Sequence, residues 1–452
     1  MFQGNRLRLQ TLSSSAKIDL SKYRIKKYKH FDNRVSINNI INDIQNPGWI
    51  VERGFFPFIH FQIKFYKYSR VEKRKKLKTR DIYYASHIDS YIYKYYGDLL
   101  NDKYNDRAKE NGINEVATAY RNTLNGKSNI HFAKEVIDFV KKTERSFIYV
   151  ADFTNFFDTL DHKYLKKQLN VVLKTKRLPD DYFAIFKNIT RFSWAEKEKI
   201  DGVLKKKYKD KDKIIKLKRL FDEEGFRRFK KSEKNNIQVN KKDYGIPQGA
   251  GLSSVCSNIY LLDFDKKIND YVNNYNGLYR RYCDDLIIII PFKGEIKNYD
   301  YQKHINYIES VKAEIPRLVI QEEKTKKFLY SENRILDEKL NQSILDYLGF
   351  AFDGNSVKLR EKSLFKYYSR AYKKIRLSNR KTEESGRKKH RRSLYVNYTH
   401  LGTRKKGHGN FLNYASRAKE IFDKDPTTIN LIESQVRNHW RKINKRLIKL
   451  KK

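Results

Sequence analysis

The stretch ADFTNFFDTL, residues 151–160, places a carboxylate, Asp152, directly after the apolar run FIYVA. The β-branched and aromatic residues of that run predict a buried strand. A second run, YRRYCDDLIIII at 279–290, predicts strand–turn–strand, with Asp284 and Asp285 directly before an apolar segment. Carboxylates at buried strand ends lose hydration and, where they converge, repel one another. Mg²⁺ removes that penalty because it prefers hard oxygen ligands, so the three residues predict a metal site.

Composition narrows the function classes. The chain has 452 residues and a net charge of 98 − 53 = +45, which indicates a nucleic acid or another polyanion as partner. An apolar fraction of 39%, with 33 Tyr and 27 Phe, excludes a disordered polyelectrolyte. No apolar stretch reaches the ~18 residues of a membrane span, and the first residues lack the apolar segment of a secretory signal. Two cysteines are too few for a disulfide framework, so we expect a reduced, cytoplasmic setting and no membrane partner.

Each acidic cluster alone would also suit an ordinary turn, where Asp is common. Five motifs in order make that reading untenable: ADFTNFFD, GIPQGAGLSSVCSNIYL, YCDD, LVIQEEKTKKFLY and YLGF. Together they resemble the bacterial branch of reverse transcriptases, which includes group II intron, retron and defence-associated enzymes. The resemblance covers residues 76–360 approximately. A free Cys283 inside the YCDD turn should behave as a small apolar residue, and Ser254 stands where many relatives have proline.

The resemblance implies an α+β fold, a right-hand polymerase with fingers, a palm built on an antiparallel sheet with helices, and a basic helical thumb. We expect a basic N-terminal extension over 1–75, fingers over 76–150, and a palm over 151–355. The palm would carry a charged insertion at about 159–244, and residues 356–452 would form the thumb. From the residues themselves, 71–80 reads as an exposed charged loop and most of 81–100 as an amphipathic helix.

For catalysis, the resemblance implies that Asp152 and Asp284 bind two Mg²⁺ ions, with Mn²⁺ as an alternative, and that Asp285 supports them. The backbone carbonyl of Phe153 would join the metal shell. Lys324 would protonate the leaving pyrophosphate; the alternative is an ordinary surface lysine.

For substrate binding, the resemblance implies a steric gate against ribose at Phe157, whose alternative is a plain core residue. It also implies nucleotide-binding residues in the fingers and in the second motif, and primer or template contacts near the YCDD turn and the YLGF hairpin. The nucleotide-binding candidates are Lys78, Arg80, Arg121, Phe157, Gln248 and Gly249, and the primer or template candidates are Tyr282, Leu348 and Gly349.

The expected reaction is RNA-directed DNA synthesis, in which a 3′-hydroxyl attacks the α-phosphate of a dNTP. The divergent second motif, the insertion and the compact basic tail favour an antiphage defence enzyme that copies a dedicated noncoding RNA. Retron or group II intron activity, template-independent or protein-primed synthesis, and a non-catalytic RNA-binding scaffold are the alternatives. We also expect a DNA primer or product as a partner. A second copy of the chain, in a homo-oligomer, is a further possible partner that the sequence leaves open.

Overall fold

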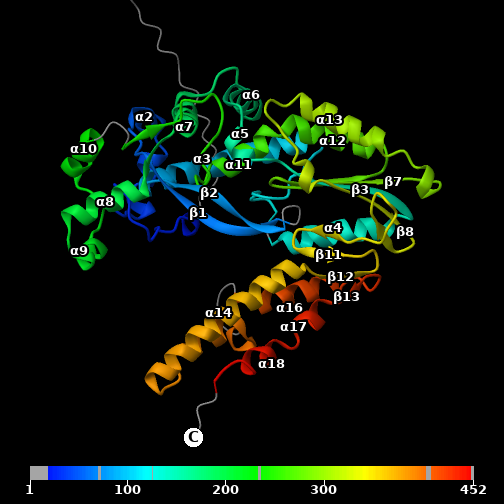
Figure 1. Cartoon of the computed structure of the whole chain (residues 1–452). Coiled ribbons are helices and arrows are strands. Elements are labelled where there is room, and N and C mark those ends of the chain that lie inside the picture. The colour runs from blue at the N-terminus through cyan, green and yellow to red at the C-terminus, as the bar shows by residue number, and fades with distance from the viewer. Residues whose placement is uncertain (1–18, 70–72, 125, 233–235, 404–408, 449–452) are drawn as a thin grey trace, which may run out of the picture. The chain divides into compact units, whose positions relative to one another are not determined.

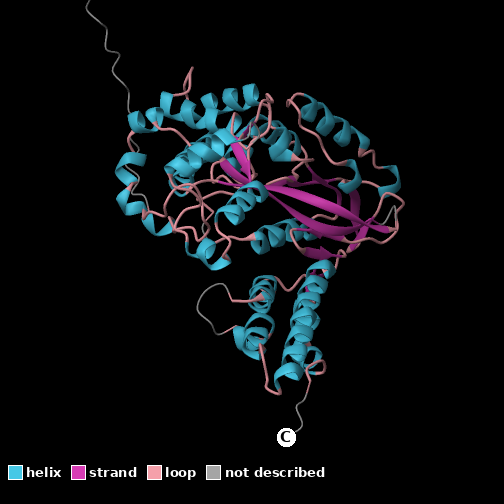
Figure 2. Ribbon diagram, turned by 60° about the vertical axis from the view of Figure 1, so that its left-hand side comes forward, coloured by secondary structure: helices cyan, strands magenta, loops and turns pink. Residues whose placement is uncertain are grey.

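The computed structural model describes residues 19–69, 73–124, 126–232, 236–403 and 409–448, in which helices and short sheets alternate (Figures 1 and 2). Residues 1–18 of the predicted N-terminal extension lie outside this part. Two compact units share the chain: unit 1 comprises Met1–Leu100 and Leu169–Ser253, and unit 2 comprises Asn101–Gln168 and Ser254–Lys452. Within the described ranges, no helix is long and apolar enough to cross a bilayer.

The sheet of unit 1 is built on a long two-stranded ribbon. Strand β1 (Phe58–Ser69) pairs antiparallel with β2 (Arg74–Tyr84), and the strand order is β2-β1-β4-β5. β4 (Ser193–Glu196) runs parallel to β1, and β5 (Gln238–Val239) is antiparallel to β4. The prediction of a charged loop over 71–80 was therefore wrong from Arg74 onward. The outer part of the ribbon is exposed on both faces, so its strands carry no apolar alternation that a sequence pattern could reveal.

Residues 169–244 of the predicted charged insertion belong to unit 1. The later part of the insertion contains helices α8 (Lys197–Lys207), α9 (Lys211–Lys216) and α10 (Glu223–Ser232). Their apolar residues form a core with the N-terminal arm and β1, in which Phe31 is stacked on Phe221 at a ring-centroid distance of 6.1 Å. The other α-helices of unit 1, including two that continue into unit 2, are α1 (Ile41–Ile44), α2 (Pro47–Glu52), α3 (His87–Glu110), α6 (His162–Leu173) and α7 (Asp180–Thr190). The helix predicted within 81–100 is thus α3.

Unit 2 contains a five-stranded antiparallel sheet in the order β6-β7-β3-β8-β9. Its strands are β3 (Arg145–Asp152), β6 (Leu278–Tyr282), β7 (Asp285–Pro291), β8 (Lys326–Ser331) and β9 (Arg334–Leu336). Helix α4 (Asn129–Lys142) packs on one face, where Ile148 and Ile287 meet its apolar side. On the other face, Phe147 stacks on Tyr301, directly before α13 (Gln302–Ala313). Since both faces are covered, LIIII is buried throughout, as its unbroken apolar run predicted.

A second sheet of unit 2 has the order β10-β11-β12-β13, with β10 (Leu345–Tyr347), β11 (Phe350–Phe352), β12 (Ser356–Leu359) and β13 (Ile429–Asn430). The C-terminal helices follow β12, with β13 inserted between the third and fourth of them: α14 (Glu361–Ser385), α15 (Arg391–Tyr398), α16 (Phe411–Phe422), α17 (Ile432–Val436) and α18 (His439–Asn444) (Figure 1). The remaining α-helices are α5 (Phe156–Thr159), α11 (Ser253–Tyr260) and α12 (Leu262–Asn273). The predicted α+β class is confirmed.

Candidate active site

The five-stranded sheet brings the three predicted carboxylates to one end of two neighbouring strands. Asp152, the last residue of β3, is the register partner of Asp285, the first residue of β7. Asp284 precedes it in the turn, and its carbonyl accepts a hydrogen bond of 3.1 Å from the N–H of Phe153. Asp152 and Asp285, 133 positions apart in the chain, are therefore neighbours because β3 and β7 pair antiparallel.

The turn before β7 has an unusual backbone. Cys283 has φ +60°, the left-handed region that non-glycine residues adopt uncommonly. Its thiol is buried, and burial followed by the charge of Asp284 raises the pKa of Cys283 to about 12. The thiol is thus protonated at neutral pH and occupies the turn as an apolar group, as its sequence context predicted.

Electrostatics at the strand ends reflect crowded carboxylates. Burial raises the pKa of Asp152, Asp284 adds to the effect, and hydrogen bonding to Lys324 opposes it. Loss of hydration and then the charges of Asp284 and Asp152 raise the pKa of Asp285 to about 6. The Lys324 ammonium contacts Oδ2 of Asp152, whereas Oδ1 of Asp152 is buried without a hydrogen-bond partner. Three carboxylates this close together attract a cation, because a positive charge lowers their repulsion.

The residues at this strand end fit a hard divalent ion. Carboxylate oxygens are the ligands that Mg²⁺ prefers, and the unpartnered Oδ1 of Asp152 is an available donor. Across the described part of the chain, no three His, Cys, Asp or Glu side chains already surround a common metal position. Lys324 instead holds one oxygen of Asp152, so an ion entering here would compete with its ammonium.

Phe153 and Phe157 lie on the segment that follows Asp152. Phe153 is buried and packs its ring against Phe156 and Phe264 at centroid distances of 5.4 and 5.7 Å. In α5, Phe156 is buried whereas Phe157 is half-exposed. The core position is therefore taken by Phe156, and the ring of Phe157 retains accessible surface.

The protein residues that we predict to contact primer or template all belong to unit 2, as Asp152 does. Tyr282 ends β6 half-buried, with its ring 6.3 Å from that of Phe132 on α4. Leu348 and Gly349 form the tight turn between β10 and β11, with φ of +45° and +94°, as two-residue hairpin turns require. The carbonyl of Leu348 accepts a hydrogen bond of 2.9 Å from Asn129 on α4.

Arg121 is bound inside unit 2. Its guanidinium donates to the carbonyl and side-chain oxygen of Asn114, each at 2.7 Å, and to Asn105, and it lies over the ring of Tyr104. The side chain is buried. These contacts favour a structural role, and its binding of a nucleotide stays a prediction.

The other predicted nucleotide-binding residues belong to unit 1. Lys78 and Arg80 are exposed on β2, where their register partners on β1 are Phe65 and Ile63. The carbonyl of Gln248 accepts a hydrogen bond of 3.1 Å from the N–H of Tyr83. Gly249 has φ +121°, and a Cβ there would lie 2.2 Å from the carbonyl oxygen of Tyr83. This loop therefore requires glycine for its close approach to β2.

A cavity of about 410 Å³ in unit 1 adjoins this loop. Its lining combines the backbone of Gly249–Gly251 with basic and tyrosine side chains from the N-terminal arm and α3. Lys94 lies over the ring of Tyr23 and is paired with Asp98, whereas Arg24 and Lys26 are exposed. Cationic groups beside aromatic rings suit a phosphate backbone with unpaired bases. Sequence patterns did not locate this cavity, although they identified the arm as basic.

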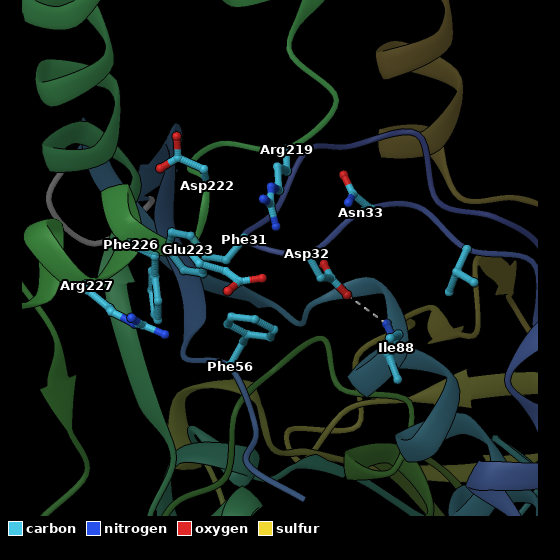
Figure 3. Close-up of a pocket in the computed structure, with 11 residues that line it drawn as sticks. Phe31, Asp32, Asn33, Phe56, Ile88, Arg219, Asp222, Glu223, Phe226 and Arg227 are labelled. Atoms are coloured by element: carbon cyan, nitrogen blue, oxygen red, sulfur yellow. Dashed lines mark hydrogen bonds between the residues drawn. The ribbon is translucent and has the colours of Figure 1, made fainter.

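A second cavity of unit 1, of about 370 Å³, lies where the insertion meets the N-terminal arm (Figure 3). Three phenylalanines line it, together with two basic residues, Arg219 and Arg227, and three acidic residues, Asp32, Asp222 and Glu223. Asp32 accepts hydrogen bonds from the N–H groups of His87 and Ile88 at the start of α3. Because opposite charges nearly balance here, this cavity lacks the cationic character of the first.

Comparison with known proteins identifies the family. The reverse transcriptase (RNA-dependent DNA polymerase) family matches residues 99–352, more than half of the chain. No curated protein sequence matches. Among solved structures, apo telomerase from Candida tropicalis truncated from the C-terminal domain has a TM-score of 0.43 at 13% identity, over 67% of this chain and 55% of that one. Telomerase from Candida albicans with a fragment of telomeric RNA has a TM-score of 0.44 at 11% identity, over 90% and 65%.

The chain thus spans 55% to 65% of the length of these two telomerases. The family match includes β3, β6 and β7, and with them all three carboxylates. The chain belongs to the reverse transcriptase family.

Proposed function

We propose that the chain is an RNA-directed DNA polymerase that extends a 3′-hydroxyl with dNTPs. The observation that carries this proposal is the opposition of Asp152 and Asp285 at the ends of β3 and β7, with Asp284 in the adjoining turn. Loss of hydration and then the charges of Asp284 and Asp152 raise the pKa of Asp285. Such a cluster costs stability unless a cation compensates it. Family membership supports the same chemistry.

In this proposal Asp152, Asp284 and the Phe153 carbonyl hold the divalent ions, and Asp285 supports them. Bound ions would lower the pKa of the primer 3′-hydroxyl and neutralise charge on the triphosphate. Phe157 presents its half-exposed ring to the sugar and excludes a 2′-hydroxyl. Lys324 lies within reach of Asp152 and donates a proton to the departing pyrophosphate.

We further propose that the template is single-stranded RNA. Part of it would enter the cavity of about 410 Å³ in unit 1 that adjoins the Gly249–Gly251 loop. Exposed Arg24 and Lys26 would contact phosphates. The partly accessible rings of Tyr28 and Tyr84 would pack against bases. Lys78 and Arg80 on the exposed ribbon would contact the triphosphate of the incoming nucleotide.

Primer extension tests the proposal. Purified wild type, a labelled primer on an RNA template, Mg²⁺ and dNTPs should yield extended products. Asp284→Asn should lower the rate by at least about 100-fold, because it removes a charge that holds the ions. Asp270→Asn is the matched control, since Asp270 is exposed on α12 and paired with Lys266. Absence of extension by wild type, or equal rates for wild type and Asp284→Asn, contradicts the proposal.

For the biological role, we propose bacterial antiphage defence with a dedicated noncoding RNA as template. The support is the divergent second motif, the compact basic tail, and an insertion whose residues 169–244 belong to unit 1. Sequencing the nucleic acids that co-purify with the protein from cells tests this. One recurrent noncoding RNA with complementary DNA supports it, a branched RNA–DNA hybrid indicates a retron, and a spliced intron indicates a maturase.

A further inference from the structure

A buried arginine lies directly beneath the turn that carries Asp284 and Asp285. Arg281, on β6, is fully buried, and its guanidinium donates to four acceptors. Nε and Nη2 bind the two oxygens of Asp265 at 2.9 and 2.5 Å, and Nη1 binds the side-chain oxygen of Asn258 at 3.1 Å. Nη1 also donates to the backbone carbonyl of Cys283 at 2.9 Å.

The surroundings fix this guanidinium in one place. Asp265 is itself fully buried on α12 and accepts a further bond of 2.8 Å from the hydroxyl of Tyr279. Asn258, on α11, is fully buried and donates to the carbonyl of Ala119. Thr118 binds the backbone carbonyl of Arg281 through its N–H and its hydroxyl, at 2.8 and 3.1 Å. Two helices, one strand and one loop of unit 2 therefore converge on the group.

The bond to Cys283 connects this network to the turn. Cys283 has left-handed backbone geometry, and its carbonyl belongs to the peptide that leads into Asp284. A donor that fixes this carbonyl fixes the plane of that peptide, and hence the direction in which Asp284 leaves the backbone. A buried ion pair is a weak source of stability, because desolvation of both charges offsets their attraction. The position of the Arg281–Asp265 pair beside the turn indicates instead that it fixes the backbone geometry of Cys283 and Asp284.

The neighbouring Arg280 provides the contrast. It lies on the same strand, and its guanidinium binds Glu135 on α4 and the carbonyl of Tyr279. These contacts lie away from the Cys283 carbonyl. Two adjacent arginines thus form ion pairs with helices, but only Arg281 has a described hydrogen bond to the turn.

We infer that Arg281 is a positioning residue for Asp284 and Asp285, acting through the carbonyl of Cys283 and held in place by Asp265 and Asn258. The inference rests on the proposed metal-binding role of the carboxylates. Groups that orient metal ligands typically change metal affinity by about 10- to 100-fold when they are removed.

The test uses a paired variant, since Arg281→Met alone would leave Asp265 buried and uncompensated. Arg281→Met with Asp265→Leu removes both charges, keeps side-chain volume similar and removes the donor to Cys283. Arg280→Met with Glu135→Leu is the matched control. Mn²⁺ binding to the full chain without nucleic acid is measured by calorimetry, alongside thermal unfolding and the kcat and KM of primer extension.

The expected result is a folded paired variant with Mn²⁺ affinity about tenfold weaker and a lower kcat, while the KM for primer–template stays unchanged. The control should match wild type in Mn²⁺ affinity. A purely structural role predicts instead that Mn²⁺ affinity and kcat follow thermal stability in both paired variants. Wild-type Mn²⁺ affinity in a folded Arg281→Met/Asp265→Leu protein overturns the inference.

A single substitution, Arg281→Lys, tests the inference if the paired variant does not fold. Arg281→Lys keeps a positive charge beside Asp265, but a compact ammonium cannot replace the planar fork that also reaches Cys283. Folded Arg281→Lys with weaker Mn²⁺ affinity supports the inference, and unchanged affinity overturns it. Failure of the proposed function is distinguishable, because Asp284→Asn would then bind Mn²⁺ as tightly as wild type.

Discussion

Asp152 and Asp285 face each other across the β3–β7 ladder as register partners, although 132 residues separate them in the chain. The pairing places two carboxylates, and a third in the adjoining turn, at one end of the central strands β3 and β7, whose other residues are mostly apolar. Loss of hydration and mutual repulsion raise the pKa of Asp285 and Asp152.

Lys324→Met should change metal binding and catalysis in opposite directions. The ammonium contacts Asp152, so its removal frees a carboxylate oxygen, and Mn²⁺ affinity without nucleotide should rise about threefold. The kcat of primer extension should fall about 100-fold, because the proton donor to pyrophosphate is lost. Exposed Lys326→Met is the control. An unchanged kcat would assign Lys324 a purely electrostatic role.

Phe157→Ala should relax sugar selectivity. The half-exposed ring of Phe157 is the proposed barrier to a 2′-hydroxyl, and its removal should raise the ratio of rNTP to dNTP incorporation about tenfold. Competitive primer extension measures that ratio. Phe156→Leu serves as the control, since Phe156 is a buried neighbour whose change should lower stability without altering selectivity. Equal ratios for wild type and Phe157→Ala refute the gate.

Gly249→Ala should destabilise unit 1 by about 1–3 kcal/mol. The backbone φ of +121° disfavours any side chain, and the added Cβ would lie 2.2 Å from the carbonyl of Tyr83. Gly202→Ala, in helix α8 with nothing within 4 Å of its Cβ, should instead stabilise by about 0.5–1 kcal/mol. Thermal unfolding of both variants measures the contrast, and equal shifts would show that the loop is not constrained as described.

Lowering the pH should reduce the free energy of unfolding, because the folded chain disfavours protonation of His304. Its ring nitrogens contact the hydroxyls of Tyr271 and Tyr299, each at 2.7 Å, and burial followed by Lys303 lowers its pKa to about 4. The unfolded chain, with a His pKa near ~6.5, binds a proton at a higher pH than the folded chain. The free energy of unfolding should therefore drop by about 2 kcal/mol from this group between pH 7 and pH 5.

His304→Gln isolates that contribution. Denaturant unfolding at pH 7 and pH 5 should show a smaller loss of stability in the variant than in wild type, whatever the baseline of each protein. The same pH dependence in both proteins would mean that folding does not lower the pKa of His304, and would contradict this prediction.

Much of the five-stranded sheet in unit 2 could be predicted from sequence, because its central strands are buried on both faces and therefore appear as unbroken apolar runs. Strand β7 and helix α4 bury most of their apolar residues, so LIIII and the face of Val136 and Val140 mark them directly. The apolar run before Asp152 marks β3 in the same way. The three carboxylates follow, because each lies at the boundary between an apolar run and a turn.

Other features depend on tertiary contacts and leave no local pattern. Strand β2 forms part of an exposed ribbon, so its basic residues resemble a loop. Arg121 resembles a surface cation in sequence, yet it is buried against Asn105 and Asn114. Arg281 was visible within YRRYCDD, but its partner Asp265 is known only once α12 packs beside β6.

The most direct test of the central claim locates the metal itself. Anomalous diffraction from crystals of the full chain grown with Mn²⁺, a primer–template and a non-hydrolysable dNTP analogue would show where ions bind. We expect Mn²⁺ peaks at the carboxylates of Asp152 and Asp284, beside Asp285. Peaks elsewhere, with no Mn²⁺ at Asp152 or Asp284, would contradict that claim.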